Sequence, residues 1–230
     1  MTKENILFIT IGLLAGLIIG FMFANSVNQK IAVPIAGTAV PNASMPAGHP
    51  DVPGVGGAMQ PEVQAAIDLA KKEPDNLDAQ MKAAELYYQI QRFDGAVEFL
   101  KRANQLKPDS REVIVHLGNA YFDMGKYEDA EKWYMSALAK KADDVDVRTD
   151  LGLTFVFREK PNYDRGIQEF QRSLEIDPNH PQTLQNLTVA YTKKGDAARA
   201  NETIAKLEGL DPANESIKKL REDILKIGAK

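Results

Sequence analysis

Residues 111–142 show two successive segments in which apolar and small residues share one face and charged residues the other. In the first segment Leu117, Gly118 and Tyr121 stand at i, i+1 and i+4, and Ala130 and Tyr134 repeat the spacing in the second. Apolar positions three and four residues apart indicate amphipathic helices. This stretch therefore predicts a helix, a turn and a second helix.

The same pattern recurs at a nearly fixed interval. Pro74 and Pro108 are 34 residues apart, as are Pro178 and Pro212. The third copy is two residues longer, and we place the insertion in a turn at 161–162 because loops accept insertions and packed helices do not. A helix pair cannot cover its own apolar face, so the copies must stack. Each copy has a small residue at one position of its second helix: Ala96, Ala130, Gly166 and Ala200.

The 34-residue period with its Leu-Gly-x-x-Tyr motif, central alanine and closing proline resembles the tetratricopeptide repeat. The resemblance covers about Leu77 to Pro212 and implies an all-α solenoid of antiparallel helix pairs. Thr188 and Leu207 occupy positions where the family has small residues. The consensus tryptophan is replaced in the four copies by Gln80, Ile114, Arg148 and Leu184.

An apolar run precedes the repeats. Ile6 to Ala24 spans nineteen residues with Thr10 as its only polar side chain, which is enough to cross a hydrocarbon core of about 30 Å. A cleaved signal peptide is the alternative, but its apolar region is usually about 7–15 residues long, and Met22 to Ala24 make a poor cleavage site. We expect an uncleaved single-pass membrane anchor.

Flanking charges and small residues refine this expectation. Lys3 before the run and Lys30 after it favour, only slightly, a cytoplasmic N-terminus. In a bacterial inner membrane the repeats would then face the periplasm. Gly12, Gly16 and Gly20 share one helical face, which suits a homo-oligomer or another membrane helix, although glycine is also common in membrane helices generally.

Residues 31–60 are rich in proline, alanine and glycine and lack helical periodicity, so we expect a flexible linker. Apolar faces predict helices that cap the two ends of the solenoid. The predicted segments, in chain order, are a short tail (1–5), the transmembrane anchor (6–24), the linker (25–60), an N-terminal capping helix (61–73), four repeats (77–108, 111–142, 145–178 and 181–212) and a C-terminal capping helix (214–230).

The composition of the chain argues against several classes of function. The net charge of −4 provides no basic stripe, so we expect no nucleic-acid partner. The chain has no cysteine, and its three histidines have no second ligand at metal-binding spacing. Asp143, Asp144, Asp146 and Asp150 lack the spacing of a calcium loop, and we interpret them as acidic residues favoured at a helix start. We therefore expect that the protein is not an enzyme and that it binds neither a cofactor nor a metal ion.

The resemblance implies that the first helix of each repeat lines a concave groove that holds a partner. The inward positions give an apolar strip with an acidic rim, which suits a protein or peptide with a basic amphipathic segment. Acidic residues at the positions of the family's carboxylate clamp disfavour docking of a chaperone C-terminus. The predicted groove residues are Met81, Glu85, Tyr88, Val115, His116, Asn119, Phe122, Asp150, Leu153, Val156, Asn186 and Val189.

Together these features predict a membrane-anchored tetratricopeptide adaptor. Its architecture resembles that of the periplasmic repeat subunits of bacterial cytochrome c maturation, which implies a role in assembling an envelope protein complex. The alternative is a structural scaffold in an oligomeric membrane or secretion assembly, to which the glycine face of the anchor would contribute.

Overall fold

The computed structural model describes residues 61–227, which belong to a unit spanning Val52–Lys230. The predicted anchor, its glycine face, the linker and the orientation of the chain in a membrane lie outside these residues. Within residues 61–227 no helix is both long and apolar enough to span a bilayer. The helices are α2 (Pro61–Lys72), α3 (Leu77–Gln89), α4 (Phe93–Leu106), α5 (Arg111–Asp123), α6 (Tyr127–Lys140), α7 (Val145–Phe157), α8 (Tyr163–Ile176), α9 (Pro181–Lys194), α10 (Ala197–Leu210) and α11 (Ser216–Leu225).

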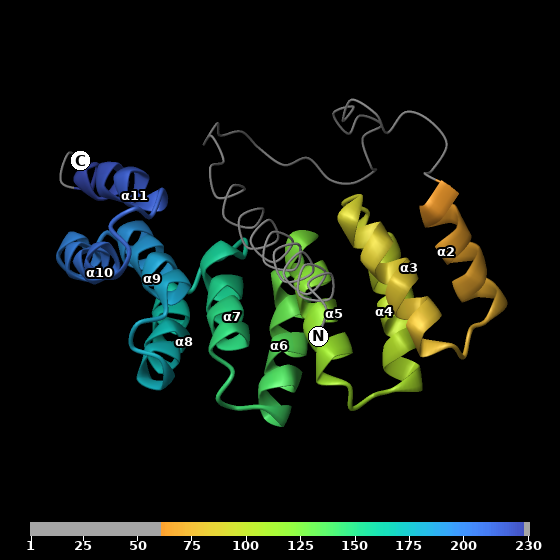
Figure 1. Ribbon diagram of the computed structural model, residues 1–230. Coiled ribbons are helices and arrows are strands. Elements are labelled where there is room, and N and C mark those ends of the chain that lie inside the picture. The colour runs from red at the N-terminus through yellow and green to blue at the C-terminus, as the bar shows by residue number, and fades with distance from the viewer. Residues whose placement is uncertain (1–60, 228–230) are drawn as a thin grey trace, which may run out of the picture. The chain divides into compact units, whose positions relative to one another are not determined.

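Each helix packs against the next in the chain, and the most extensive contacts join α3 to α4, α5 to α6, α7 to α8 and α9 to α10. Figure 1 shows these four antiparallel pairs following one another, with α2 before the first pair and α11 after the last. The described residues contain no strand. The predicted all-α solenoid of helix pairs is confirmed.

Side-chain caps define where most of the first helices begin. The side chains of Asn76, Ser110 and Asp144 accept hydrogen bonds from the backbone N–H three residues ahead. His180 makes no such bond, and α9 begins instead with Pro181, whose fixed φ suits the first helical position. Asn214 accepts from the N–H of Ser216 at 3.1 Å.

The turn within a pair needs a left-handed residue at three of the four repeats. Gly125 and Gly195 have φ of 71° and 84° there, a conformation that glycine adopts without strain. Gln91 takes the same place in the first repeat with φ of 60°. In the third repeat the longer turn replaces this residue, and Asn162 caps α8 by accepting from the N–H of Arg165 at 3.1 Å.

Small residues allow the helices of a pair to approach closely. A Cβ added at Gly118 would lie 2.6 Å from the Tyr134 ring, and one at Gly152 would lie 2.5 Å from the Phe170 ring. Tyr134 and Phe170 are both buried. Close packing of this kind explains why the repeat alternates small and large residues.

Two hydrophobic clusters meet at α7. Val147, Leu151 and Phe155 belong to the cluster that extends from α2 through α6, whereas Leu153 and Val156 belong to the cluster that extends through α11. Most positions of α7 from Val147 to Val156 are therefore buried. This helix connects the two halves of the solenoid.

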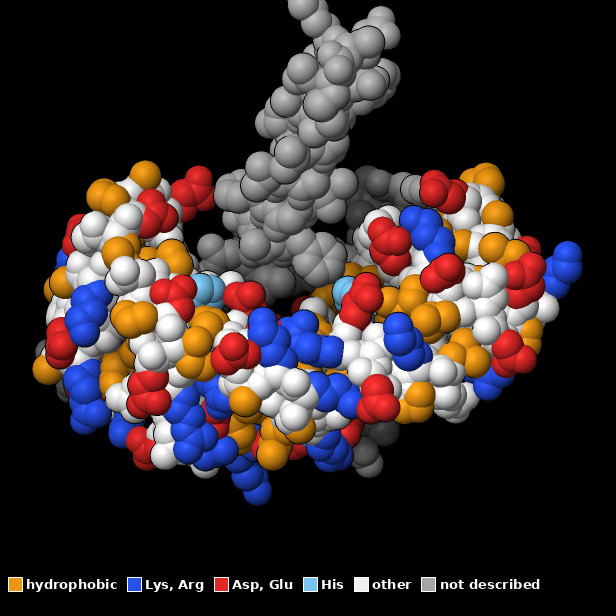
Figure 2. Space-filling view, turned by 60° about the horizontal axis from the view of Figure 1, so that its bottom comes forward, with side chains coloured by type: hydrophobic (Ala, Val, Ile, Leu, Met, Phe, Trp, Pro, Cys, Tyr) orange, Lys and Arg blue, Asp and Glu red, His pale blue; other side chains and the backbone are white. Residues whose placement is uncertain are grey.

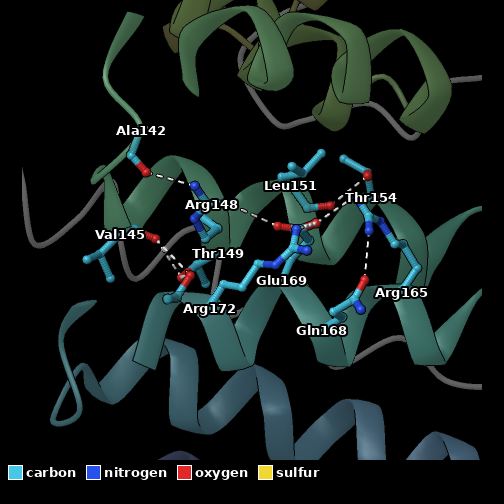
Figure 3. A network of polar contacts seen from close by, with 11 residues as sticks. Ala142, Val145, Arg148, Thr149, Leu151, Thr154, Arg165, Gln168, Glu169 and Arg172 are labelled. Atoms are coloured by element: carbon cyan, nitrogen blue, oxygen red, sulfur yellow. Dashed lines mark hydrogen bonds and ion pairs between the residues drawn. The ribbon is translucent and has the colours of Figure 1, made fainter. Parts of the chain in front are cut away.

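The third pair encloses a charged network. Glu169 on α8 is 1% exposed and pairs with Arg148 of α7 at 3.0 Å. Arg165 and Arg172, on either side of it along α8, approach the same carboxylate at 2.9 and 3.1 Å. Figure 3 shows the carboxylate between the two helices, surrounded by the guanidinium groups.

Candidate interaction groove

The first helices of successive repeats lie side by side. The Tyr88 hydroxyl on α3 donates a hydrogen bond to Asp123 on α5. Phe122 on α5 meets Phe157 on α7 edge-on, with ring centroids 6.4 Å apart. These contacts place the inward faces of α3, α5 and α7 in one layer. Figure 2 shows acidic and histidine side chains near one another on the surface of the repeats.

The predicted groove residues differ in accessibility within this layer. Glu85 and His116 are exposed. Six are half-buried, namely Met81, Tyr88, Val115, Asn119, Phe122 and Asp150. Four are buried, and all of them lie on α7 or α9: Leu153, Val156, Asn186 and Val189.

Several predicted residues also make contacts inside the solenoid. Tyr88 packs edge-on against Phe93 at 5.0 Å, and Phe122 does the same with Tyr127 at 5.2 Å. Asn119 accepts a hydrogen bond from the Tyr134 hydroxyl at 2.9 Å. Burial and the neighbouring Asp123 raise the pKa of Tyr88 well above its usual range. These side chains therefore help to hold adjacent helices together, whatever else they bind.

A hollow of about 580 Å³ opens between the inward faces of α5 and α7. Val115 and Asn119 line one side, and Asp146 and Asp150 line the other. Its remaining lining residues are Arg111, Lys141, Asp143, Asp144, Val145 and Val147.

Two of the four aspartates in this hollow have partners. Asp144 pairs with Arg111 and also caps α7, and the Asp146 carboxylate lies 3.1 Å from Nε2 of His180. That hydrogen bond to His180 lowers the pKa of Asp146. The interpretation of acidic residues at a helix start thus describes Asp144 well.

Asp150 differs from Asp144 and Asp146 in its contacts. Within residues 61–227 its carboxylate forms no hydrogen bond or ion pair. Burial, reinforced by the negative charges of Asp146 and Asp123, raises its pKa to about 7. The group therefore titrates near neutral pH, which is unusual for an aspartate.

Asn186 on α9 stands at the same place in the fourth repeat as Asp150 in the third. It is 2% exposed, and its Nδ2 has no acceptor among the described residues. A buried amide that donates no hydrogen bond is destabilising by about 1–3 kcal/mol. Among residues 61–227, the Asp150 carboxylate and Nδ2 of Asn186 thus have no hydrogen-bond partner.

Sequence reasoning missed the polar contacts that connect the third and fourth repeats. Nδ1 of His180 lies 2.7 Å from the Thr183 hydroxyl, which in turn lies 2.6 Å from the Thr149 hydroxyl. Both threonines are fully buried. Threonine inside a helix gives no distinctive sequence signal, since it also occurs on exposed faces. Residues 61–227 contain no group of three or more acidic or histidine side chains placed to hold a metal ion.

Comparison with known proteins agrees with this architecture. Family models described as tetratricopeptide repeat match residues 60–111 and 91–149. The chain contains tetratricopeptide repeats. The fold is also that of solved repeat structures. A crystal structure of MamA superposes with a TM-score of 0.58 at 24% identity, over 65% of this chain and 81% of that one.

A second solved structure is described as YrrB, a tetratricopeptide protein with an unusual peptide-binding site. It superposes on this tetratricopeptide-repeat chain with a TM-score of 0.53 at 18% identity, over 72% of this chain and 89% of that one. Among curated proteins, the photosystem I assembly protein Ycf3 of Prochlorococcus marinus is 28% identical over 36% of the chain and 49% of its own length. Protein O-mannosyl-transferase TMTC3 of Homo sapiens is 23% identical over 55% of the chain and 14% of its own length. The matched region therefore spans less than half of either relative.

Proposed function

We propose that this tetratricopeptide-repeat protein is an adaptor that holds a segment of a partner protein against the inward face of α3, α5, α7 and α9. The proposal rests chiefly on the hollow between α5 and α7, where apolar Val115 and Val145 lie beside Asp146 and Asp150. Such a surface suits an amphipathic segment with basic residues, because apolar burial supplies affinity and the acidic groups select charge.

The relatives support an adaptor role in general terms. YrrB is described as having a peptide-binding site, and Ycf3 as an assembly protein. We further propose that residues 6–24 anchor the chain in a bacterial inner membrane by a single pass, with the repeats in the periplasm. The linker before α2 would give the groove reach above the membrane, and the client would belong to an envelope complex under assembly.

Site-specific photo-crosslinking in intact cells tests the groove. A benzoylphenylalanine at Val115 lies in the hollow, whereas one at Met135 on α6, which is 53% exposed, serves as the matched control on the second helix of the same pair. We expect a discrete adduct with a partner protein from position 115 and none from position 135. Equal labelling from both positions would contradict groove binding. An adduct with a second copy of the chain would point to the scaffold role instead.

A further inference from the structure

A series of polar contacts crosses from α7 to the start of α9 and passes through a histidine. Nε2 of His180 lies 3.1 Å from the Asp146 carboxylate, and Nδ1 lies 2.7 Å from the Thr183 hydroxyl. The Thr183 hydroxyl lies 2.6 Å from the Thr149 hydroxyl, which in turn lies 2.8 Å from the backbone carbonyl of Val145. Four contacts at hydrogen-bonding distance therefore follow one another from a carboxylate to a carbonyl.

The two ends of this series can only accept hydrogen bonds. An ionised carboxylate and a backbone carbonyl have no proton to donate, so the four contacts need four protons from the three groups between them. Each threonine hydroxyl supplies one proton, a neutral imidazole supplies one more, and an imidazolium supplies two. With a neutral ring, one contact must bring two lone pairs together. With the imidazolium, every contact is a hydrogen bond.

Burial makes the missing proton unfavourable. Thr149 and Thr183 are both 0% exposed, so bulk water cannot supply the hydrogen bond that a neutral ring leaves unmade. Ser173 on α8 is equally buried and lies 3.3 Å from the Thr149 hydroxyl oxygen. It can donate to that oxygen, but its proton cannot enter the contact between the two threonines. The count of protons therefore favours the imidazolium.

The charges around His180 favour the cation as well. Its electrostatic partners on α7 are Asp146 and Asp150, and the hydrogen bond from the histidine lowers the pKa of Asp146. The first turn of α9 has no acidic residue, and the buried Glu169 of α8 is paired with its own arginines. Other charged groups at this corner are Asp177 in the turn before the histidine, and Lys141 and Arg111, which act on Asp146.

We propose that His180 is an imidazolium that links the third repeat to the fourth, donating to Asp146 through Nε2 and to Thr183 through Nδ1. Thr183 then donates to Thr149, and Thr149 donates to the carbonyl of Val145. Loss of the proton breaks one of these four bonds. Since histidine is the side chain that ordinarily changes charge between about pH 5 and 8, the link between α7 and α9 loosens as the pH rises through that range. This link does not depend on what the groove binds.

Nitrogen-15 NMR of the full chain in lipid nanodiscs, labelled at histidine alone, tests the charge directly. The chain has three histidines, and the signals of His180 are those that vanish in His180→Gln. At pH 7, where an ordinary histidine is mostly neutral, we expect both ring nitrogens of His180 to be protonated. One protonated and one unprotonated ring nitrogen at that pH would overturn the inference.

Three threonine variants test the series of hydrogen bonds. Thr183→Val removes the acceptor of Nδ1, and Thr149→Val frees the Thr183 hydroxyl to donate to a neutral ring. Each should lower the proton affinity of His180 about tenfold, although Thr149 lies one hydroxyl further along the series. Thr188→Val is the matched control, because Thr188 is equally buried on α9 and its hydroxyl donates to the Leu184 carbonyl of its own helix. A Thr149→Val effect no larger than that of Thr188→Val would contradict the proposed link.

Urea denaturation of the parent chain and of Thr183→Val, at pH 5 and at pH 8, tests the consequence for folding. A proton that the folded chain binds more tightly than the unfolded chain stabilises the fold at low pH, and this contribution is lost as the pH rises. We therefore expect Thr183→Val to lower the folding equilibrium constant by about five- to tenfold more at pH 5 than at pH 8. Asp150 is present in both chains, so its own titration cancels in this comparison. An equal effect at the two pH values would show that the link does not depend on a proton.

Discussion

The first two repeats and the last two have the same backbone plan but different interiors. Of the eleven buried polar or charged side chains in the described chain, nine lie in α7 to α10, whereas α3 to α6 contain only Gln80. At one position of the second helix the contrast is direct: α4 has Phe99, and α8 has the buried carboxylate of Glu169. One fold can thus have an almost wholly apolar interior in one half and a partly polar interior in the other.

Removal of the buried Glu169 carboxylate should have the largest effect on stability. Glu169→Ala leaves Arg148, which is 16% exposed in its side chain, without a counter-ion, and we expect a loss of about 3–5 kcal/mol in the free energy of unfolding. Urea denaturation followed by circular dichroism measures it. Glu98→Ala, at an exposed position of α4, is the control and should change stability by less than about 0.5 kcal/mol.

A double variant gives the third repeat apolar residues like those of the first two repeats. Arg148→Ile with Glu169→Phe introduces the residue types found at Ile114 and Phe99, and we expect stability to return to within about 1 kcal/mol of the parent chain. A double variant as unstable as Glu169→Ala would show that the network has a role that apolar packing cannot replace.

Close packing should matter equally in both halves. Gly118→Ala and Gly152→Ala each push a methyl group into a buried ring, so we expect each to lose about 1–3 kcal/mol by the same denaturation assay. Gly209→Ala in α10 meets no atom within 4 Å and should instead gain up to about 1 kcal/mol. A clear difference between the first two variants would show that the halves also differ in how tightly they pack.

Asp150 should make stability depend on pH. Its folded pKa of about 7 lies above the ordinary value of 3.8, so the folded state holds the proton more tightly than the unfolded state. The contribution of protonated Asp150 to the free energy of unfolding is therefore fully present below about pH 4. It falls as the pH rises from about 4 to 7, and it is lost above about pH 7. We expect Asp150→Asn to gain about 1–2 kcal/mol at pH 8 and almost nothing at pH 4, as thermal unfolding across pH would show.

The smallest change in stability should come from the turn between α3 and α4. Gln91 adopts a positive φ where the second and fourth repeats have glycine. Gln91→Gly relieves this strain, and we expect a gain of about 0.5–1 kcal/mol in thermal unfolding. Gly125→Gln, the reverse change one repeat later, should lose a similar amount.

The fold was predictable because its information is local and repeated. The interval between prolines and the small residues at Gly118 and Ala130 specify helix pairs without any knowledge of distant contacts. The groove was predictable only as a set of inward positions. Sequence position alone does not show that Tyr88 contacts Asp123 in the next repeat. Nor does it show that Asp144 has a partner while Asp150 has none among residues 61–227.

Departures from the repeat pattern in the third repeat indicate a buried ion pair. Arg148 stands where the family has an apolar residue, and Glu169 stands where earlier repeats have Phe99 and Trp133. Two opposite charges at core positions of one repeat suggest a buried ion pair, which the structure has at 3.0 Å. Thr183 and Thr149 gave no comparable signal, because threonine is compatible with both surfaces and cores.

The position of α7 in both hydrophobic clusters has a mechanical consequence. A repeat array transmits force only between neighbours, so the helix shared by two cores determines whether the array bends as one body or as two. A partner segment held in the hollow between α5 and α7 would brace this joint and make the whole array stiffer. Recognition and rigidity would then be set by a single helix.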